Sequence, residues 1–296
     1  MSALALIAHR RGVPVTGCDT DPSGAADLSG EGVVVERGHD AGHAAGIRGM
    51  VVTAAVPAEH PEIRAARHAG IPVIPRKDAL AALIGGRDTV ALAGTHGKTS
   101  TTVMATLALE AAGCSPTGLA GGRVSAWGGN ARPGGDELFV VEADEYDRAL
   151  LALHPTVAVI NNVEPDHLEC YGTVAALEEA FAEFASRARH VFLGAEDPGA
   201  RRVGSALPSP LYFGLRHADV RLEDVALSPD ESLATVRFPG GREVALRLTV
   251  PGLHNLRNAT GALCAVWALG ADLDRATEAL AGYSGLGRRF ERLGEA

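Results

Sequence analysis

Short apolar runs alternate with helical stretches along the first part of the chain. Four runs have the length and β-branched content of strands, namely 13–17, 33–35, 50–53 and 71–74. Helices are predicted over 1–11, 61–69 and 77–84. Alternation of strands and helices indicates a parallel sheet. This part is therefore predicted to be a Rossmann-like α/β unit, and the polar, glycine-containing residues 85–88 are predicted to be a linker.

The pattern continues beyond residue 88 and then changes character. Continuous apolar runs at 89–93, 138–141, 157–160 and 191–194 are typical of strands buried on both faces. Helices are predicted over 98–112, 173–188, 255–269 and 273–280. Residues 220–227, 233–238 and 243–250 instead alternate around turns, which predicts a small antiparallel meander. Within the glycine-rich residues 118–135, Gly121-Gly122 and residues 128–131 are predicted to flank a flexible loop. The second part is therefore also predicted to be α/β.

A glycine turn connects the strand at 89–93 to the helix that follows it. Its residues are Gly94, Thr95, His96, Gly97, Lys98, Thr99 and Ser100. Backbone N–H groups at a helix N-terminus favour an anion, and Lys98 adds a full charge, so the turn is predicted to cradle phosphates. Thr99 is placed to offer its hydroxyl to Mg²⁺. The general P-loop motif has glycine where this chain has Leu92, and a glycine turn that only caps a helix is the alternative.

Carboxylates and a histidine follow two neighbouring strands. Glu142 opens an acidic stretch directly after 138–141, and His167 lies in an Asn- and Asp-containing stretch after 157–160. Ligands bind at the carboxyl ends of strands in open α/β sheets, and Mg²⁺ prefers oxygen ligands. Glu142 is therefore predicted to bind Mg²⁺, and Asp166-His167 to supply a second metal ligand or a phosphate contact. The alternatives are a solvated acidic loop for Glu142 and a structural role for His167.

Further polar residues are candidates for binding the rest of a ligand. His254, Asn255 and Asn258 open a predicted helix and could contact a base, with helix capping as the alternative. Asn130 and Ala131 lie in a glycine-rich stretch that allows close approach to a ligand. Arg288 could hold a phosphate or belong to an exposed basic linker.

Composition excludes several classes of function. Hydrophobic residues make up 46% of the chain and the net charge is −9, which argues against a nucleic-acid or anionic-membrane surface. The four cysteines are scattered with no C-x-x-C pair, so their spacing indicates neither a zinc site nor a disulfide framework. No apolar run approaches the roughly 20 residues of a membrane span, and a signal peptide is not indicated. A cytoplasmic location without membrane insertion is expected. The sequence does not predict an oligomeric state.

Taken together, these motifs resemble the Mur ligase family. The shared elements are Gly-Thr-His-Gly-Lys-Thr, Glu-Ala-Asp-Glu, Glu-Pro-Asp-His, His-Asn-x-x-Asn, Gly-Gly-Asn-Ala and Arg-Arg-Phe. The resemblance covers nearly the whole length of the chain. The resemblance is strongest to the branch that joins L-alanine to the carboxylate of UDP-N-acetylmuramate. It implies an ATP-dependent ligase of peptidoglycan precursor synthesis that works through an acyl phosphate. It also implies that Lys98, Glu142 and His167 are catalytic.

The resemblance assigns the remaining site residues as well. The turn from Gly94 to Ser100 would hold the ATP phosphates. Thr99 and Glu142 would hold one Mg²⁺, and His167 a second. His254, Asn255 and Asn258 would form the adenine side, and Asn130, Ala131 and Arg288 would contact the muramate substrate. Many relatives carry a modified lysine after the metal-site motifs, and this chain has no lysine after Lys98; the alanine-adding branch is expected to lack it too.

Compared with the family pattern, the chain is expected to be a fragment at both ends. Residues 1–86 are predicted to be a truncated UDP-substrate-binding domain, 87–285 the central ATP-binding domain, and 286–296 a linker to a missing C-terminal domain. Such a chain is expected to bind Mg-ATP weakly and to have little ligase activity. The alternatives are a murein-peptide recycling ligase of the same superfamily and a nucleotide-binding protein that is not a ligase.

Overall fold

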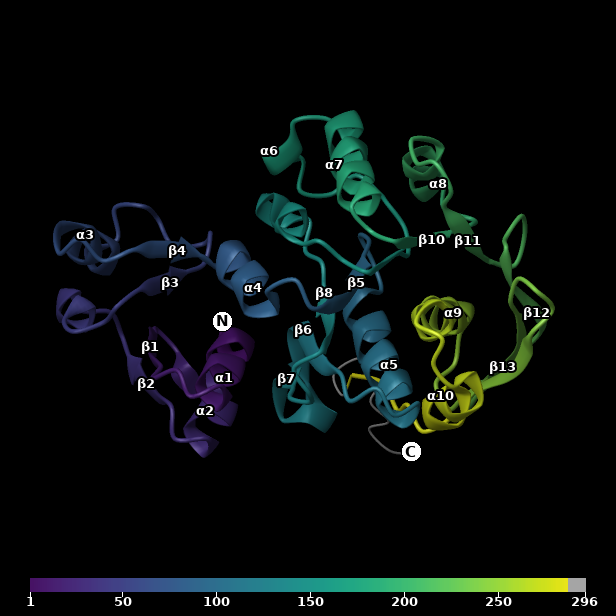
Figure 1. The fold of residues 1–296 in the computed structure, drawn as a ribbon, viewed down its shortest axis with the longest axis horizontal. Helices are drawn as coiled ribbons and strands as arrows, with labels where there is room; N and C mark the ends of the chain where they lie inside the picture. The colour runs from purple at the N-terminus through teal and green to yellow at the C-terminus, as the bar shows by residue number, and fades with distance from the viewer. Residues whose placement is uncertain (287–296) are drawn as a thin grey trace. The chain divides into compact units, whose positions relative to one another are not determined.

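The chain forms two compact units. A computed structural model describes residues 1–286 (Figure 1). The first unit is Met1–Gly85 together with the short segment Gly128–Ala131, and the second comprises Gly86–Trp127 and the chain from Arg132 onward. The two units are described separately.

The first unit contains two pairs of parallel strands, flanked by helices. Strand β1 (Thr16–Asp19) pairs with β2 (Val34–Arg37), and β3 (Met50–Val52) pairs with β4 (Val73–Pro75). The helices are α1 (Ser2–Arg10), α2 (Ala26–Gly30), α3 (Pro61–His68) and α4 (Arg76–Ile84), with short 3₁₀ turns η1 (Pro22–Ala25) and η2 (Ala41–Ala44). Helix α4 ends at Gly85, whose φ of 58° is the left-handed conformation that closes many helices.

The second unit is organised around a large, mostly parallel sheet. Its strands follow the order β14-β13-β12-β11-β10-β9-β5-β8-β6. They are β5 (Asp88–Ala93), β6 (Thr117–Val124), β8 (Leu138–Glu142), β9 (Val157–Ile160), β10 (His190–Gly194), β11 (Leu211–Gly214), β12 (Val220–Leu227), β13 (Ser232–Arg237) and β14 (Glu243–Leu248). All neighbouring pairs from β6 to β12 are parallel, whereas β12, β13 and β14 are antiparallel. Strand β7 (Gly129–Arg132) starts in the segment grouped with the first unit.

Helices cover both faces of this sheet (Figure 1). Helix α5 (Lys98–Ala111) packs with α9 (Leu253–Ala268) and α10 (Leu273–Leu280) on one face, and α7 (Val174–Ser186) packs with α8 (Pro198–Ser205) on the other. The remaining elements are the short helix α6 (Leu168–Tyr171) and the 3₁₀ segments η3 (Ser125–Trp127) and η4 (Tyr146–Ala152). Because helices lie on both faces, every residue of β9 is buried. In β14 the buried residues alternate with exposed ones.

The mixed α/β architecture with a mostly parallel sheet is confirmed, with three differences in detail. The predicted meander is not a separate sheet, because β11 and β12 pair in parallel and join it to the main one. The stretch predicted as a loop between Gly121-Gly122 and Gly128-Gly129 holds the end of β6 and the 3₁₀ segment η3. Glycine suits β6 because a Cβ on Gly118 would lie 2.7 Å from Thr106 Oγ1 of α5. Helix α8 was not predicted.

Candidate functional site

The glycine turn lies at the carboxyl end of the central strand β5, between β8 and β9. Helix α5 begins at Lys98, directly after the turn. Gly97 has a φ of 82°, and a Cβ at this position would lie 2.5 Å from Asn258 Oδ1. Gly94 has a φ of 130°, and its Cβ would lie 3.0 Å from the carbonyl oxygen of Asn162. Both positions therefore require glycine. The backbone N–H of Thr95 is bonded to the carbonyl oxygen of Asn162 at 3.2 Å.

Lys98 is held at the base of the turn by a buried carboxylate. Its Nζ donates to Glu145 Oε1 and Oε2 at 2.7 and 2.8 Å, and to the carbonyl oxygen of Gly94 at 2.7 Å. The Glu145 side chain is 3% exposed and that of Lys98 14%. Burial raises the pKa of the Glu145 carboxyl, and the Lys98 ammonium opposes that rise. The ion pair fixes the positive charge of Lys98 beside the glycine turn.

Glu142 and Thr99 are the two oxygen donors predicted to bind Mg²⁺. Glu142 ends β8 opposite Leu92 of β5, so it lies at the same edge of the sheet as the turn. Its Oε2 accepts a hydrogen bond from the Gly121 N–H at 2.7 Å, which orients the half-buried carboxylate. Within residues 1–286 the Thr99 hydroxyl has no hydrogen-bond partner.

His167 lies beside a carboxylate that was not predicted as a metal ligand, that of Glu145. Donor atoms of Glu145, Asp166 and His167 lie within 4.8 Å of one another. His167 has a φ of 50°, and its ring stacks edge-on against Tyr146 with centroids 5.3 Å apart. Glu142 is not a member of this group. A cluster of two carboxylates and an imidazole at a sheet edge has the donors needed to bind a divalent cation.

Two asparagines that were not predicted as site residues hold the glycine turn in place. Asn162 Oδ1 accepts from the backbone N–H of His96 at 2.8 Å, and Asn161 Nδ2 donates to Thr101 Oγ1 at 2.8 Å. The Thr95 hydroxyl also accepts from the backbone N–H of Glu164 at 2.8 Å. Both asparagines directly follow β9, and that position at the end of a central strand is the sequence signal that could have identified them.

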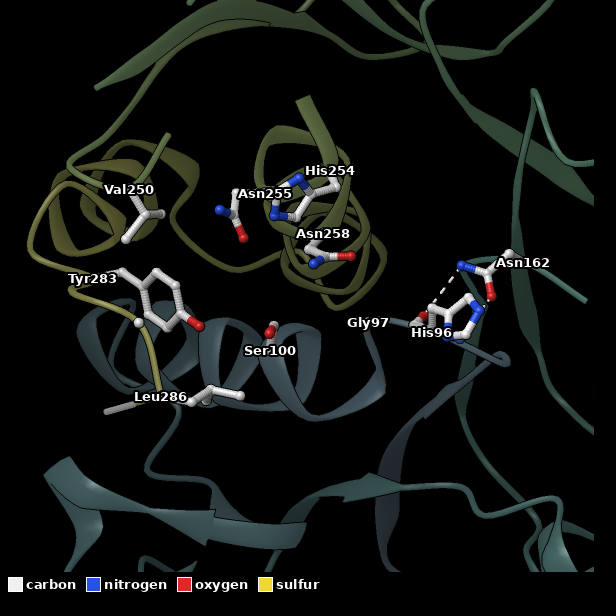
Figure 2. Close-up of a pocket in the computed structure, with 11 residues that line it drawn as sticks. His96, Gly97, Ser100, Asn162, Val250, His254, Asn255, Asn258, Tyr283 and Leu286 are labelled. Carbon is white, nitrogen blue, oxygen red and sulfur yellow. Dashed lines mark hydrogen bonds between the residues drawn. The ribbon is translucent and has the colours of Figure 1, made fainter. Parts of the chain in front are cut away.

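A cavity of about 340 Å³ opens beside the turn (Figure 2). Side chains of α9, α5 and the segment after α10 converge on it, and its lining residues are His96, Gly97, Ser100, Asn162, Val250, His254, Asn255, Asn258, Tyr283, Gly285 and Leu286. The predicted residues His254, Asn255 and Asn258 all belong to this lining. Three apolar or aromatic members (Val250, Tyr283 and Leu286) were not predicted, because they come from segments with no motif.

The first turn of α9 presents the amides of the cavity. The helix begins at Leu253 after Gly252, and no side chain caps it, so the capping alternative does not describe His254 or Asn255. Asn255 Nδ2 donates to the carbonyl oxygen of Pro251 at 2.8 Å. Asn258 lies one turn further along and its Oδ1 is 3.5 Å from Asn161 Nδ2. The cavity therefore combines amide groups with an apolar wall.

Asn130 and Ala131 lie outside this cavity. Asn130 and Ala131 belong to the segment grouped with the first unit, where Asn130 Oδ1 accepts from the Ser2 hydroxyl at 2.7 Å. Ala131 is buried. Arg288 lies outside the described residues. Among residues 1–286, no helix has the length and apolar character needed to cross a membrane.

Comparison with known families gives two matches that together cover most of the chain. Residues 92–266 match the Mur ligase middle domain, and residues 1–87 match the Mur ligase family catalytic domain. Curated relatives named UDP-N-acetylmuramate–L-alanine ligase include one from Kineococcus radiotolerans and one from Clavibacter michiganensis. Each is 42% identical, over 100% and 98% of this chain. The chain spans 65% and 62% of the length of these relatives.

Solved structures show the same fold. The UDP-N-acetylmuramate-alanine ligase of Thermotoga maritima superposes with a TM-score of 0.86 at 31% identity, over 98% of this chain and 67% of that one. The UDP-N-acetylmuramate:L-alanyl-γ-D-glutamyl-meso-diaminopimelate ligase of Neisseria meningitidis superposes with a TM-score of 0.85 at 26% identity. That match covers 97% of this chain and 96% of that one.

Proposed function

The chain belongs to the Mur ligase family, and from this premise we propose that it catalyses the ATP-dependent joining of L-alanine to the carboxylate of UDP-N-acetylmuramate. One observation carries the proposal. The glycine turn that could cradle phosphates also forms a wall of the cavity, since His96, Gly97 and Ser100 belong to both. A ligand with a phosphate chain joined to a flat polar group fits such a continuous surface. ATP is such a ligand.

Within this site, each part of ATP has its own set of residues. The turn from Gly94 to Ser100 binds the phosphates, while Asn255, Asn258 and His254 contact the adenine edge and Tyr283 packs against the base. The three Lys98 N–H donors are already engaged by Glu145 and by the carbonyl oxygen of Gly94. The γ-phosphate must therefore replace one of these contacts. Glu145 acts as a positioning residue that keeps the Lys98 ammonium aimed at the turn.

The donor set at the sheet edge fits Mg²⁺. The Thr99 hydroxyl has no partner within the described part of the chain, and the backbone N–H of Gly121 engages only one oxygen of Glu142. These two residues would hold one ion. His167 would hold a second, together with Glu145 and Asp166, whose donor atoms lie within 4.8 Å of it. Magnesium supplies charge neutralisation between phosphate oxygens when it is bound.

The reaction consists of two displacements. A muramate carboxylate oxygen attacks the γ-phosphorus, ADP leaves, and an acyl phosphate forms. The amine nitrogen of L-alanine then attacks the acyl carbon, inorganic phosphate leaves, and the nitrogen loses a proton. No side-chain nucleophile is required, because positioning and charge stabilisation lower both barriers. Lys98 stabilises the charge on the transferred phosphoryl group.

The first unit is proposed to bind the UDP-linked substrate, and Asn130 and Ala131 to contact its muramoyl group. Arg288 is proposed to contact the same substrate. The first family match, over residues 1–87, supports a separate role for this unit. Because ATP is the co-substrate, a cytoplasmic location is proposed.

Isotope transfer tests the reaction directly. The chain is incubated with Mg²⁺, ATP, L-alanine and UDP-N-acetylmuramate labelled with ¹⁸O in its carboxylate. An acyl phosphate passes one carboxylate oxygen to phosphate. However slow the turnover of this chain, mass spectrometry should therefore find one ¹⁸O in each phosphate released and one alanyl product for each phosphate. Lys98→Ala should release neither, and Lys77→Ala should behave as the parent.

Other outcomes would identify the alternatives. Product formed with the tripeptide L-alanyl-γ-D-glutamyl-meso-diaminopimelate in place of L-alanine would reassign the chain to peptide recycling. Phosphate release that requires neither carboxylate nor amine substrate, with no ¹⁸O transfer, would contradict a ligase and leave a nucleotide-binding protein.

A further inference from the structure

The first unit contains a second polar cluster, centred on the carboxylate of Glu62. This residue lies in the first turn of α3 and its side chain is 8% exposed. Cys18 of β1, His39 after β2, and the flanking His43 and His60 all direct a sulfur or nitrogen atom toward it. One thiol and three imidazoles therefore surround a single buried carboxylate. One positive partner would be enough to compensate its charge.

Three of these donor atoms form a nearly equilateral triangle. Cys18 Sγ lies 3.4 Å from His39 Nδ1 and 3.4 Å from Glu62 Oε2, and His39 Nδ1 lies 3.3 Å from the same oxygen. In a tetrahedral zinc site, bond lengths of about 2.0–2.3 Å place neighbouring ligand atoms about 3.3–3.6 Å apart. The triangle therefore already has the edge lengths of one face of a zinc coordination tetrahedron.

The surroundings orient the carboxylate for this purpose. Its other oxygen, Oε1, accepts from the backbone N–H of Asp40 at 3.1 Å and from His43 Nδ1 at 2.6 Å. His43 is in turn held by Glu36, whose Oε2 lies 3.2 Å from Nε2. Cys18 Sγ faces both carboxylate oxygens, at 3.2 Å from Oε1 and 3.4 Å from Oε2, whereas His39 Nδ1 faces Oε2. Such outer contacts are typical of metal sites, where they set the direction of each ligand.

His60 supplies an independent observation. Its Nδ1 is buried and has no hydrogen-bond partner within residues 1–286, although it lies 3.7 Å from Glu62 Oε2. Its ring packs edge-on against that of His39, with centroids 4.8 Å apart. A buried imidazole nitrogen without a partner is costly, and a water molecule bound to a metal could supply the missing hydrogen bond.

We propose that Cys18 Sγ, His39 Nδ1 and Glu62 Oε2 bind a zinc ion, with water in the fourth position. Sulfur and imidazole ligands select a borderline-soft cation such as Zn²⁺ over Mg²⁺. The exposed His39 gives the ion a route from solvent. The three ligands come from β1, the segment after β2, and α3, so the ion cross-links elements far apart in the sequence. Binding would stabilise the first unit.

Cobalt substitution tests the ligand set. The chain is stripped with a chelator, dialysed, and titrated with Co²⁺ while its absorption spectrum is recorded. A thiolate-to-cobalt charge-transfer band should grow to one equivalent, and Zn²⁺ should abolish it. Cys18→Ser should remove the band, whereas Cys114→Ser, which replaces a half-buried cysteine of the second unit, should retain it. Cobalt held by Glu145, Asp166 and His167 has no sulfur ligand and gives no such band.

Stability supplies the second readout. Zinc should raise the melting temperature of the parent chain and of Cys114→Ser in calorimetry, and should leave those of Cys18→Ser and His39→Ala unchanged. His39→Ala retains the thiol and replaces a partly exposed side chain, so it tests the site even where Cys18→Ser folds poorly. No cobalt–thiolate band, or a band independent of Cys18, would reduce the cluster to a hydrogen-bonded network around Glu62. ATP binding to the second unit is unaffected by either result.

Discussion

Glu62 in the first unit and Glu145 in the second are both buried glutamates, but their partners differ in kind. Glu145 is compensated by the permanent charge of Lys98, two hydrogen bonds from one ammonium. Glu62 is surrounded by a thiol and imidazoles, whose charge depends on pH and on bound metal. A fixed ion pair keeps a cation ready for a phosphate. A set of thiol and imidazole donors around a carboxylate instead suits a metal ion. The chemistry of each site follows from the partner rather than from the glutamate.

Breaking the fixed pair should have the largest effect. Lys98→Ala leaves Glu145 buried without its cation, so the second unit should lose about 3 kcal/mol, near the lower end for a broken buried pair because Lys98 retains some exposure. Both tryptophans, Trp127 and Trp267, belong to this unit, so their fluorescence during urea unfolding reports it.

A second substitution sharpens that prediction. Adding Glu145→Gln to Lys98→Ala removes the uncompensated charge and should restore most of the lost stability. If Lys98→Ala alone unfolds like the parent chain, the pair is not the buried, coupled one that the structure shows.

The backbone of the turn should rank next. Gly97→Ala adds a Cβ to a left-handed residue and places it 2.5 Å from Asn258 Oδ1, so both strain and a clash are introduced. Left-handed backbone alone costs about 1–2 kcal/mol for a residue with a Cβ. In urea unfolding, the loss of stability caused by Gly97→Ala should exceed this cost. The substitution should also abolish ATP binding.

Gly113→Ala is the matched control for the turn. This glycine follows α5 with a φ of 86°, and no atom lies within 4 Å of its Cβ position. It should show only the loss due to strain, with unchanged ATP affinity. Equal effects of the two variants on ATP binding would mean that close packing of the turn against Asn258 does not matter.

The smallest effect should come from the pH-dependent partner of Glu62. The hydrogen bond to Glu62 raises the pKa of His43 above 6.5, with Glu36 and Glu62 both adding charge attraction. In the presence of a chelator, His43 should therefore stabilise the first unit fully below pH 6.5 and lose this contribution as pH rises through the raised pKa. NMR titration of the His43 imidazole measures its pKa. The difference in unfolding free energy between the parent chain and His43→Ala at each pH measures its contribution to stability. A pKa at or below 6.5 would contradict the assigned contact.

The sequence identified local motifs better than it identified partners. The turn from Gly94 to Ser100 was predictable because strand, glycines, Lys-Thr and helix are contiguous, and the family resemblance that it began is confirmed. Glu145 could not be distinguished from its acidic neighbours, because its pairing with Lys98 depends on β8 lying beside β5. Tyr283 enters the cavity only through the packing of the segment after α10.

The Glu62 cluster shows the same limit more clearly. Cysteine spacing indicated no zinc site, and Cys18, His39 and Glu62 share no motif. They meet because β1 pairs with β2 and α3 packs against η2. Ligands brought together by folding across distant segments leave no regular spacing to detect. The meander is a milder case, since its hairpins were predicted but its parallel junction with β11 was not.

The central claim is that the glycine turn binds ATP, and calorimetric titration of the chain with Mg-ATP measures this most directly. The chain has only two lysines, Lys77 and Lys98, so each can be replaced in turn. We predict one ATP per chain. A charge-assisted contact to phosphate contributes about 1.5–3 kcal/mol, so Lys98→Ala should weaken binding about 10- to 100-fold. Lys77→Ala should bind as the parent does. Equal affinities for the parent and Lys98→Ala, or no binding heat in the parent, would contradict an ATP site at the glycine turn.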